Sequence, residues 1–213
     1  MNKLLQGVLM VLLTLCVVIR ELHGAPMEVK YERVSNWDEF SNSLKLSKKL
    51  LNESRNLKII YVESWLKGAH VNFSRSLGNL PLASIKINDW LRLKAGERLR
   101  LLHEGLQVFP VYLKKLEEWK EKEDSHLSGD GSIPFARRIS IVQLDLRDLL
   151  HHIKIQMSVF KVSPSESLTV MEPSSDGSDW HSRIVMFQAL RSMEQFLFRA
   201  VREYTALRHT TRD

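Results

Sequence analysis

Cysteine is almost absent from this chain. Its 213 residues include one cysteine, Cys16, which lies in an apolar stretch near the N-terminus. The rest of the chain therefore has no disulfide framework and no cysteine nucleophile. A chain without disulfides has to obtain its stability from a hydrophobic core of sufficient size.

Catalytic motifs and long charge runs are also missing. The sequence has no glycine-rich phosphate loop, no nucleophile elbow and no His-Glu-x-x-His zinc motif. No block of five like charges interrupts a formal net charge of +6. That mildly basic balance permits contact with acidic receptors or heparan sulfate, although solubility is the simpler interpretation. We expect no enzymatic activity, no cofactor and no nucleic-acid partner.

The N-terminal segment has the three parts of a secretory signal peptide. Lys3 precedes an apolar run over residues 4–19, and Gly24 precedes Ala25 and Pro26. We predict cleavage after Gly24, which leaves one mature domain over residues 25–213. An uncleaved signal anchor is the alternative, but the run is short for a bilayer span and no second apolar run follows. The mature chain is thus expected to be secreted and not inserted in a membrane.

Two glycosylation sequons agree with secretion. They begin at Asn52 and Asn72, and neither has proline in its middle position. The helical spacing around Asn52 places a glycan there toward water.

Hydrophobic periodicity predicts four helices, at about residues 36–67, 92–124, 134–161 and 179–209. In the last of them, apolar residues recur in steps of three and four. These residues are Trp180, Ile184, Phe187, Leu190, Met193, Leu197, Val201 and Tyr204. Residues 59–62 are rich in β-branched side chains, so a strand is the alternative there. Pro110 is expected to kink the second helix near Leu106, whose carbonyl loses its N–H partner.

Connection lengths predict the topology of the four helices. The connections over residues 68–91, 125–133 and 162–178 contain 24, 9 and 17 residues. They reach at most about 79, 30 and 56 Å. The middle connection is shorter than its helices and requires an antiparallel pair, whereas the long ones allow parallel crossovers. The prediction is an all-α, up-up-down-down four-helix bundle with two long crossover loops.

Two residue pairs are candidates for function. Asp148 and His152 lie one turn apart, but a metal site in a bundle needs further ligands, so a solvated face is favoured. Trp180 and Arg183 share one flank of the last helix and belong to the residue types that dominate binding hot spots. Stapling a loop to the core is the alternative role for Trp180.

The chain resembles long-chain helical cytokines of the interleukin-6 type, most closely ciliary neurotrophic factor and cardiotrophin-like cytokine. The resemblance covers nearly the whole mature chain and is carried by SLKLSKKLLNESRNLKIIYVESWLKG, LPLASIKINDW, GERLRLLHEGLQVFPVYLKKL, DWHSR and FLFRAVRE. That family has a Phe-x-x-Lys motif at the start of its fourth helix, which engages the leukaemia inhibitory factor receptor. The matching positions here are Trp180 and Arg183, where both identities differ from the motif.

The resemblance also implies partners and further site residues. Arg199 and Glu203 match an arginine and an acidic residue that bind the family's α-receptor. Exposed faces of the first and third helices are expected to bind glycoprotein 130, and the α-receptor is expected to be of the ciliary neurotrophic factor type. We expect a monomeric secreted cytokine that triggers JAK–STAT signalling. The alternative is a secreted helical carrier of a small apolar ligand, although the Leu-, Ile- and Phe-filled seams favour a closed core.

Overall fold

The computed structural model describes residues 36–67, 80, 85–123, 134–165 and 180–210. The chain divides into two compact units, Met1–Val34 and Ser35–Asp213, and every described residue belongs to the second. The predicted signal peptide, its cleavage point and the sequon at Asn72 lie outside the described residues.

All the regular secondary structure in the described part of the chain is helix, and no strand occurs there. The segment over residues 59–62 is therefore helix and not strand. The long helices follow from amphipathic sequences whose apolar residues recur in steps of three and four. The elements are α2 (Asn36–Tyr61), the π-helix η1 (Val62–Leu66), α3 (Ile87–Arg92), α4 (Ala95–Leu106), α5 (Phe109–Glu123), α6 (Phe135–Val159) and α7 (Trp180–Thr210).

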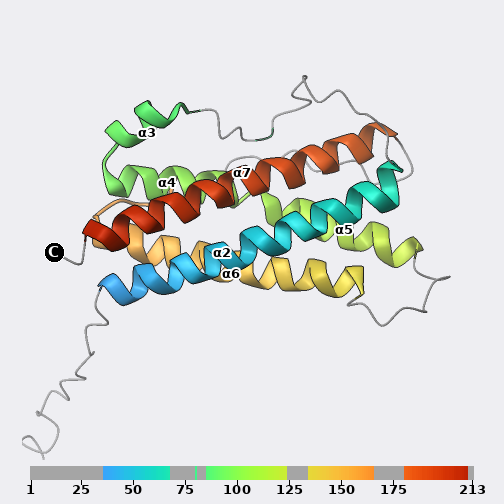
Figure 1. Ribbon diagram of the computed structural model, residues 1–213, viewed down its shortest axis with the longest axis horizontal. Helices are drawn as coiled ribbons and strands as arrows, with labels where there is room; N and C mark the ends of the chain where they lie inside the picture. The colour runs from blue at the N-terminus through green and yellow to red at the C-terminus, as the bar shows by residue number, and fades with distance from the viewer. Residues whose placement is uncertain (1–35, 68–79, 81–84, 124–133, 166–179, 211–213) are drawn as a thin grey trace, which may run out of the picture. The chain divides into compact units, whose positions relative to one another are not determined.

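The long helices form a bundle with the predicted up-up-down-down topology. In Figure 1, α2 and the α4–α5 pair run in one direction, whereas α6 and α7 run in the other. Cross-helix contacts give the same directions, because rising residue numbers on one helix meet falling numbers on its neighbour. Between α2 and α6 the pairs are Lys49–Asp145 and Glu53–Arg138. Between α2 and α7 they are Phe40–Tyr204 and Tyr61–Arg183, and between α4–α5 and α7 they are Arg98–Glu203 and Phe109–Phe196. The predicted fold class is confirmed.

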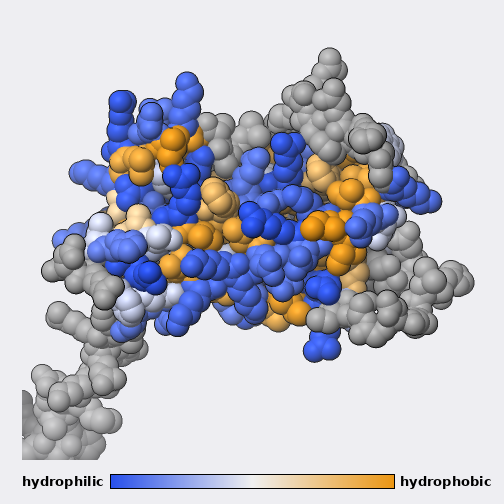
Figure 2. Space-filling view, in the orientation of Figure 1, coloured by the Kyte–Doolittle hydropathy of each residue, from blue (hydrophilic) through white to orange (hydrophobic). Residues whose placement is uncertain are grey.

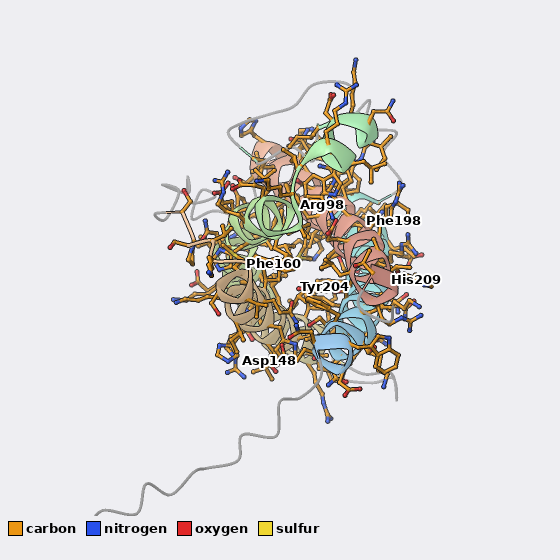
Figure 3. The ribbon with its side chains drawn as sticks, turned by 90° about the vertical axis from the view of Figure 1, so that its left-hand side faces the viewer. Arg98, Asp148, Phe160, Phe198, Tyr204 and His209 are labelled. Atoms are coloured by element: carbon orange, nitrogen blue, oxygen red, sulfur yellow. The ribbon has the colours of Figure 1, made fainter. Side chains whose placement is uncertain are left out.

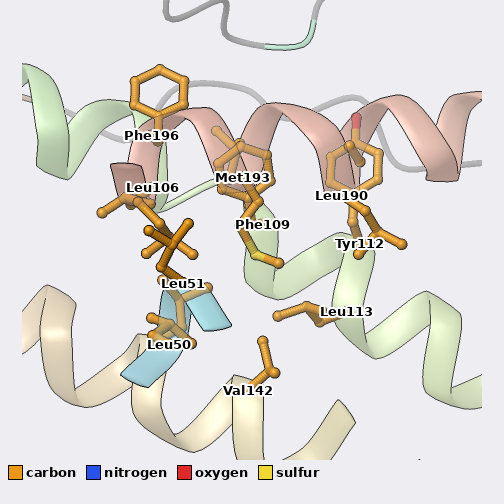
Figure 4. Packing of buried hydrophobic residues seen from close by; sticks show 14 of the residues in the cluster. Leu50, Leu51, Leu106, Phe109, Tyr112, Leu113, Val142, Leu190, Met193 and Phe196 are labelled. Atoms are coloured by element: carbon orange, nitrogen blue, oxygen red, sulfur yellow. The ribbon is translucent and has the colours of Figure 1, made fainter. Parts of the chain in front are cut away.

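A continuous hydrophobic core runs along the bundle axis. Figure 4 shows side chains from all the long helices meeting there. Leu50, Leu106 and Val142 lie on α2, α4 and α6, and all three are buried. Burying a side chain of this size stabilises the fold by roughly 1.5–3 kcal/mol. The four predicted hydrophobic stripes therefore face one another.

One buried polar network crosses the core near the C-terminal end of α7. The Tyr204 hydroxyl donates to Gln156 Oε1 at 2.7 Å, and Gln156 Nε2 donates to the Ser43 hydroxyl at 2.8 Å. Burial raises the pKa of Tyr204, so its phenol keeps the proton that it donates. Because all three polar side chains are buried and bonded, the network fixes the register of α2, α6 and α7.

The second predicted helix is two helices in the structure, α4 and α5. α4 ends at Leu106 and α5 begins at Phe109, so the expected kink is a break at Gln107 and Val108. Pro110 explains its position, because it has no N–H to donate to the Leu106 carbonyl. The start also differs: α3 precedes an extended Leu93 and Lys94, so the helix of the bundle starts at Ala95 and not near Arg92.

The first predicted helix has an unexpected last turn. η1 continues α2 as a π-helix, and Lys67 after it adopts the left-handed conformation with φ 43°. π-turns widen the backbone locally and occur frequently at functional sites. This one lies against the first turn of α7.

Candidate interaction surfaces on the last helix

The start of α7 presents an exposed tryptophan beside an arginine that is already bonded. Half of the Trp180 surface is accessible to solvent, at 50%. Arg183, one turn later, donates from Nη1 to the Trp65 carbonyl of η1 at 3.3 Å. The Tyr61 hydroxyl donates in turn to the Arg183 carbonyl at 2.9 Å. Trp180 is therefore available to a partner, whereas Arg183 also joins α7 to the end of α2.

Aromatic side chains stiffen the bundle beneath this surface. The Trp65 ring lies 5.0 Å from Tyr61, 5.9 Å from Trp119 and 6.2 Å from Phe135, measured between ring centroids. Burial raises the pKa of Tyr61 despite the opposing charge of Arg183, so the phenol stays protonated and donates. The cluster joins α2, α5 and α6 below the first turn of α7.

Glu203 and Arg199 occupy different environments from those expected. Glu203 is only 3% exposed, and its Oε2 accepts from Arg98 Nε at 2.7 Å and from Trp90 Nε1 at 3.2 Å. Arg199 lies over the Trp90 ring at 4.7 Å and donates from Nη2 to the Ile85 carbonyl at 2.8 Å. The resemblance implies that both residues contact the α-receptor, but Glu203 is buried, and both side chains hold the α3 segment on α7.

The α3 segment presents apolar side chains that the sequence analysis assigned to a connection. Trp90 is its one buried residue, whereas Ile87 and Leu91 are 42% and 63% exposed. Phe198 of α7 is 48% exposed. Figure 3 shows Phe198 and Arg98 on the side of the bundle that carries α3, with Tyr204 at its centre. The sequence signal was the i,i+4 spacing of Ile87 and Leu91 on either side of Trp90.

A groove of about 630 Å³ separates α3 from the adjoining faces of α2 and α7. Its wall includes Arg55 and Lys58, which both bind the Glu194 carboxylate. Burial alone would raise the pKa of Glu194, but these two cations outweigh it, and the pKa lies below its ordinary value. The groove is lined by Arg55, Lys58, Ile87, Trp90, Leu91, Arg98, Arg191, Glu194, Gln195, Phe198, Arg199, Arg202, Glu203 and Ala206.

A second, smaller surface joins α2 and α6. A pocket of about 170 Å³ is lined by Glu39, Asn42, His152, Ile155 and Gln156. Near it, the end of α6 exposes Ile155 and Val159 at 45% and 47%. These two helices correspond to the first and third predicted helices, whose exposed faces are expected to bind glycoprotein 130.

The candidate metal pair is not assembled into a site. The Asp148 carboxylate accepts from Arg147 at 2.9 Å, and His152 Nδ1 lies 3.3 Å from the Ser43 hydroxyl. Within the described ranges, no group of three or more His, Cys, Asp or Glu side chains gathers where it could hold a metal ion.

Asn52 is exposed on α2, as its spacing predicted. None of the helices that the structure describes combines the length and apolarity needed to cross a bilayer.

Comparison with known proteins supports a helical cytokine family. No protein-family profile matches the chain. It is 27% identical over 186 residues to interleukin-27 subunit alpha of Sus scrofa, covering 79% of this chain and 73% of that protein. It is 28% identical over 191 residues to interleukin-27 subunit alpha of Homo sapiens, covering 79% and 74%. These relatives are cytokines, which are not enzymes, and they do not favour the ciliary neurotrophic factor branch in particular.

Proposed function

We propose that this chain is a secreted cytokine that assembles a receptor complex of the leukaemia inhibitory factor receptor and glycoprotein 130 type and triggers JAK–STAT signalling. The observation that carries the proposal is the similarity to interleukin-27 subunit alpha over 79% of the chain. The up-up-down-down bundle supports it, because cytokine bundles have this topology. The predicted signal peptide and the exposed sequon at Asn52 support secretion and glycosylation.

Three surfaces are proposed to bind three partners. Trp180 at the start of α7 binds the chain of the leukaemia inhibitory factor receptor type, with its indole as the anchor. The α2–α6 surface around Ile155 binds glycoprotein 130. The α3–α7 groove binds a third chain, either an α-receptor of the ciliary neurotrophic factor type or a second subunit. The relatives support this third surface, because each is named as a subunit.

The roles of Arg199 and Glu203 are proposed to be indirect. The resemblance implies that both touch the α-receptor. Their bonds to Trp90, Arg98 and the Ile85 carbonyl support a role in holding α3 where a partner meets it. Arg183 has a comparable position beside Trp180, because it donates to the Trp65 carbonyl.

STAT phosphorylation in reconstituted cells tests the proposal. Cells carrying glycoprotein 130 and the leukaemia inhibitory factor receptor, with and without the α-receptor, are treated with the purified mature chain. We expect a dose-dependent response that falls at least about tenfold in potency with Trp180→Ala, the loss typical of one hot-spot residue. Lys114→Ala, which truncates an exposed side chain of α5 outside the three surfaces, is the control and should signal normally. Silence of the folded protein in every receptor combination would contradict the proposal.

A further inference from the structure

We infer that the α3–α7 groove binds a protein segment in which an apolar side chain is flanked by carboxylates. The inference deepens the proposed function and rests on it, because it specifies the chemistry of the third chain. The groove offers an exposed apolar rim, an excess of positive charge and a fixed backbone frame, and each of these features selects for one property of the partner.

The apolar rim consists of Leu91 and Ile87 on α3 and Phe198 on α7. They are 63%, 42% and 48% exposed, and all three line the same groove. Figure 2 shows hydrophobic residues over α3 bordered by hydrophilic ones. An apolar centre with a polar rim is the anatomy of a protein–protein interface. The groove therefore suits a side chain such as leucine or phenylalanine from the partner.

The charge of the groove is strongly unbalanced. Six of the lining residues are lysine or arginine, and two are glutamate. Glu194 is bound by Arg55 and Lys58, and Glu203 is bound by Arg98. The lining therefore carries a formal net charge of +4, and complementary charge in a partner raises association rate and specificity.

Two of these arginines, Arg199 and Arg202, lie one turn apart on α7. Burial and the neighbouring charge of Arg202 both lower the pKa of Arg199 below its ordinary value. A carboxylate placed beside them would offset that repulsion through charge-assisted hydrogen bonds. A neutral segment would leave the repulsion between the two arginines uncompensated.

The frame that carries the rim is held in place before any partner arrives. Trp90 inserts its ring under Arg199 and donates to Glu203, while Arg98 donates to the Leu93 carbonyl at 2.6 Å. Together with the bond from Arg199 to the Ile85 carbonyl, these bonds fix both ends of α3 on the bundle. A preformed rim lowers the ordering cost of binding, which favours recognition of a defined segment.

A sulfated polysaccharide is the other anionic partner that a basic groove can attract. Its sugar and sulfate groups gain little from Leu91 or Phe198, so the exposed apolar rim favours a protein segment instead. The two partners predict different effects of truncating the rim, which the experiment below uses.

The test is a titration of the ¹⁵N-labelled mature chain, followed by NMR, with four probes. The first is a short peptide with one phenylalanine flanked by aspartates and glutamates. In the second peptide asparagine and glutamine replace the acidic residues, and in the third alanine replaces the phenylalanine. The fourth probe is a heparin fragment. We expect saturable binding of the acidic phenylalanine peptide, with the largest shifts on α3 and the facing part of α7. Each counterpart peptide should bind at least about tenfold more weakly, as loss of one anchor or of complementary charge requires.

Variants of exposed residues separate the contributions of rim and charge. Leu91→Ala and Phe198→Ala should each lower the affinity for the acidic phenylalanine peptide about tenfold. Arg202→Glu should lower that affinity by a similar factor and also reduce the salt dependence of binding. The controls are Leu144→Ala and Arg137→Glu on α6, which make the same changes outside the groove. Absence of saturable peptide binding would overturn the inference. So would tighter heparin binding that depends on Arg202 and not on Leu91 or Phe198, which would assign the groove to a polysaccharide.

The same variants separate this inference from the proposed function. If wild-type protein signals and Leu91→Ala and Phe198→Ala signal equally well, the inference fails and the proposed function stands. If wild-type protein is silent in every receptor combination and still binds the acidic peptide through the rim, the proposed function fails and the chemistry of the groove stands.

Discussion

The carboxylate of Glu203 is almost removed from water and depends on Arg98 for its charge balance. The side chains of this ion pair are 16% and 3% exposed. Removing one partner of a buried pair leaves the other uncompensated, so Glu203→Ala should lower the free energy of unfolding by about 3 kcal/mol. Urea denaturation measures this. Asp89→Ala, which breaks a solvent-exposed pair with Arg92, should cost less than about 1 kcal/mol. Equal effects of the two variants would contradict this account of α3.

His103 should make stability depend on pH. Burial, together with the charge of Lys154, lowers its pKa below the ordinary value, although Glu104 opposes the shift. Below about pH 6.5 the unfolded chain protonates this imidazole while the folded chain keeps it neutral. Unfolding then takes up a proton. Stability therefore falls as the pH drops from about 6.5 toward the lower pKa of the folded state, and this histidine does not affect it above that range. Denaturation at pH 7.5 and 5.5 should show a smaller loss for His103→Asn than for the wild type, and an identical loss would refute it.

The exposure of single residues was only partly predictable from the sequence. Trp180 is exposed at the start of a helix, as a hot-spot residue must be. The burial of Glu203 was not foreseeable, because the residues that bury it come from a segment more than 100 positions earlier. Helical spacing reports the face on which a residue lies. It does not report which connection folds over that face.

At the level of elements, the approach of α4 to α7 depends on Gly105. A Cβ atom added there would overlap the ring of Phe196, which is itself buried. Overpacking costs typically 1–3 kcal/mol, against a gain of about 1 kcal/mol in helix propensity. Gly105→Ala should therefore lower the melting temperature by a few degrees. The double variant with Phe196→Leu should be less destabilised than the sum of the two single effects, because the smaller side chain removes the overlap. Strictly additive effects would contradict direct contact between the two residues.

Element boundaries show where local rules are sufficient and where they are not. The position of the α4–α5 break follows from Pro110, whose missing N–H acts locally. The π-turn of η1 and the helix α3 depend on contacts with α7, from Arg183 to Trp65 and from Glu203 to Trp90. A short helix stabilised by one buried tryptophan carries too little periodicity to be distinguished from a loop.

At the level of the whole bundle, topology was predictable because it depends on chain lengths. A connection of nine residues cannot return along a long helix, so α5 and α6 had to be antiparallel. The register was not predictable, since it depends on cross-helix pairs such as Lys49 with Asp145 and on the network around Gln156. The surfaces that carry the proposed function lie at different places on this frame, at the start of α7 and at the α3–α7 groove.

The central claim is that separate surfaces of one bundle bind separate receptor chains, and Trp180→Ala tests it most directly. STAT phosphorylation is measured in receptor-bearing cells with the variant alone and with the variant in excess over wild-type protein. The account predicts that the variant is at least about tenfold less potent than the wild type and that, in excess, it inhibits the wild type, because its remaining surfaces still occupy receptor chains. A variant with full wild-type activity would contradict the claim, and so would an inactive, folded variant that fails to inhibit.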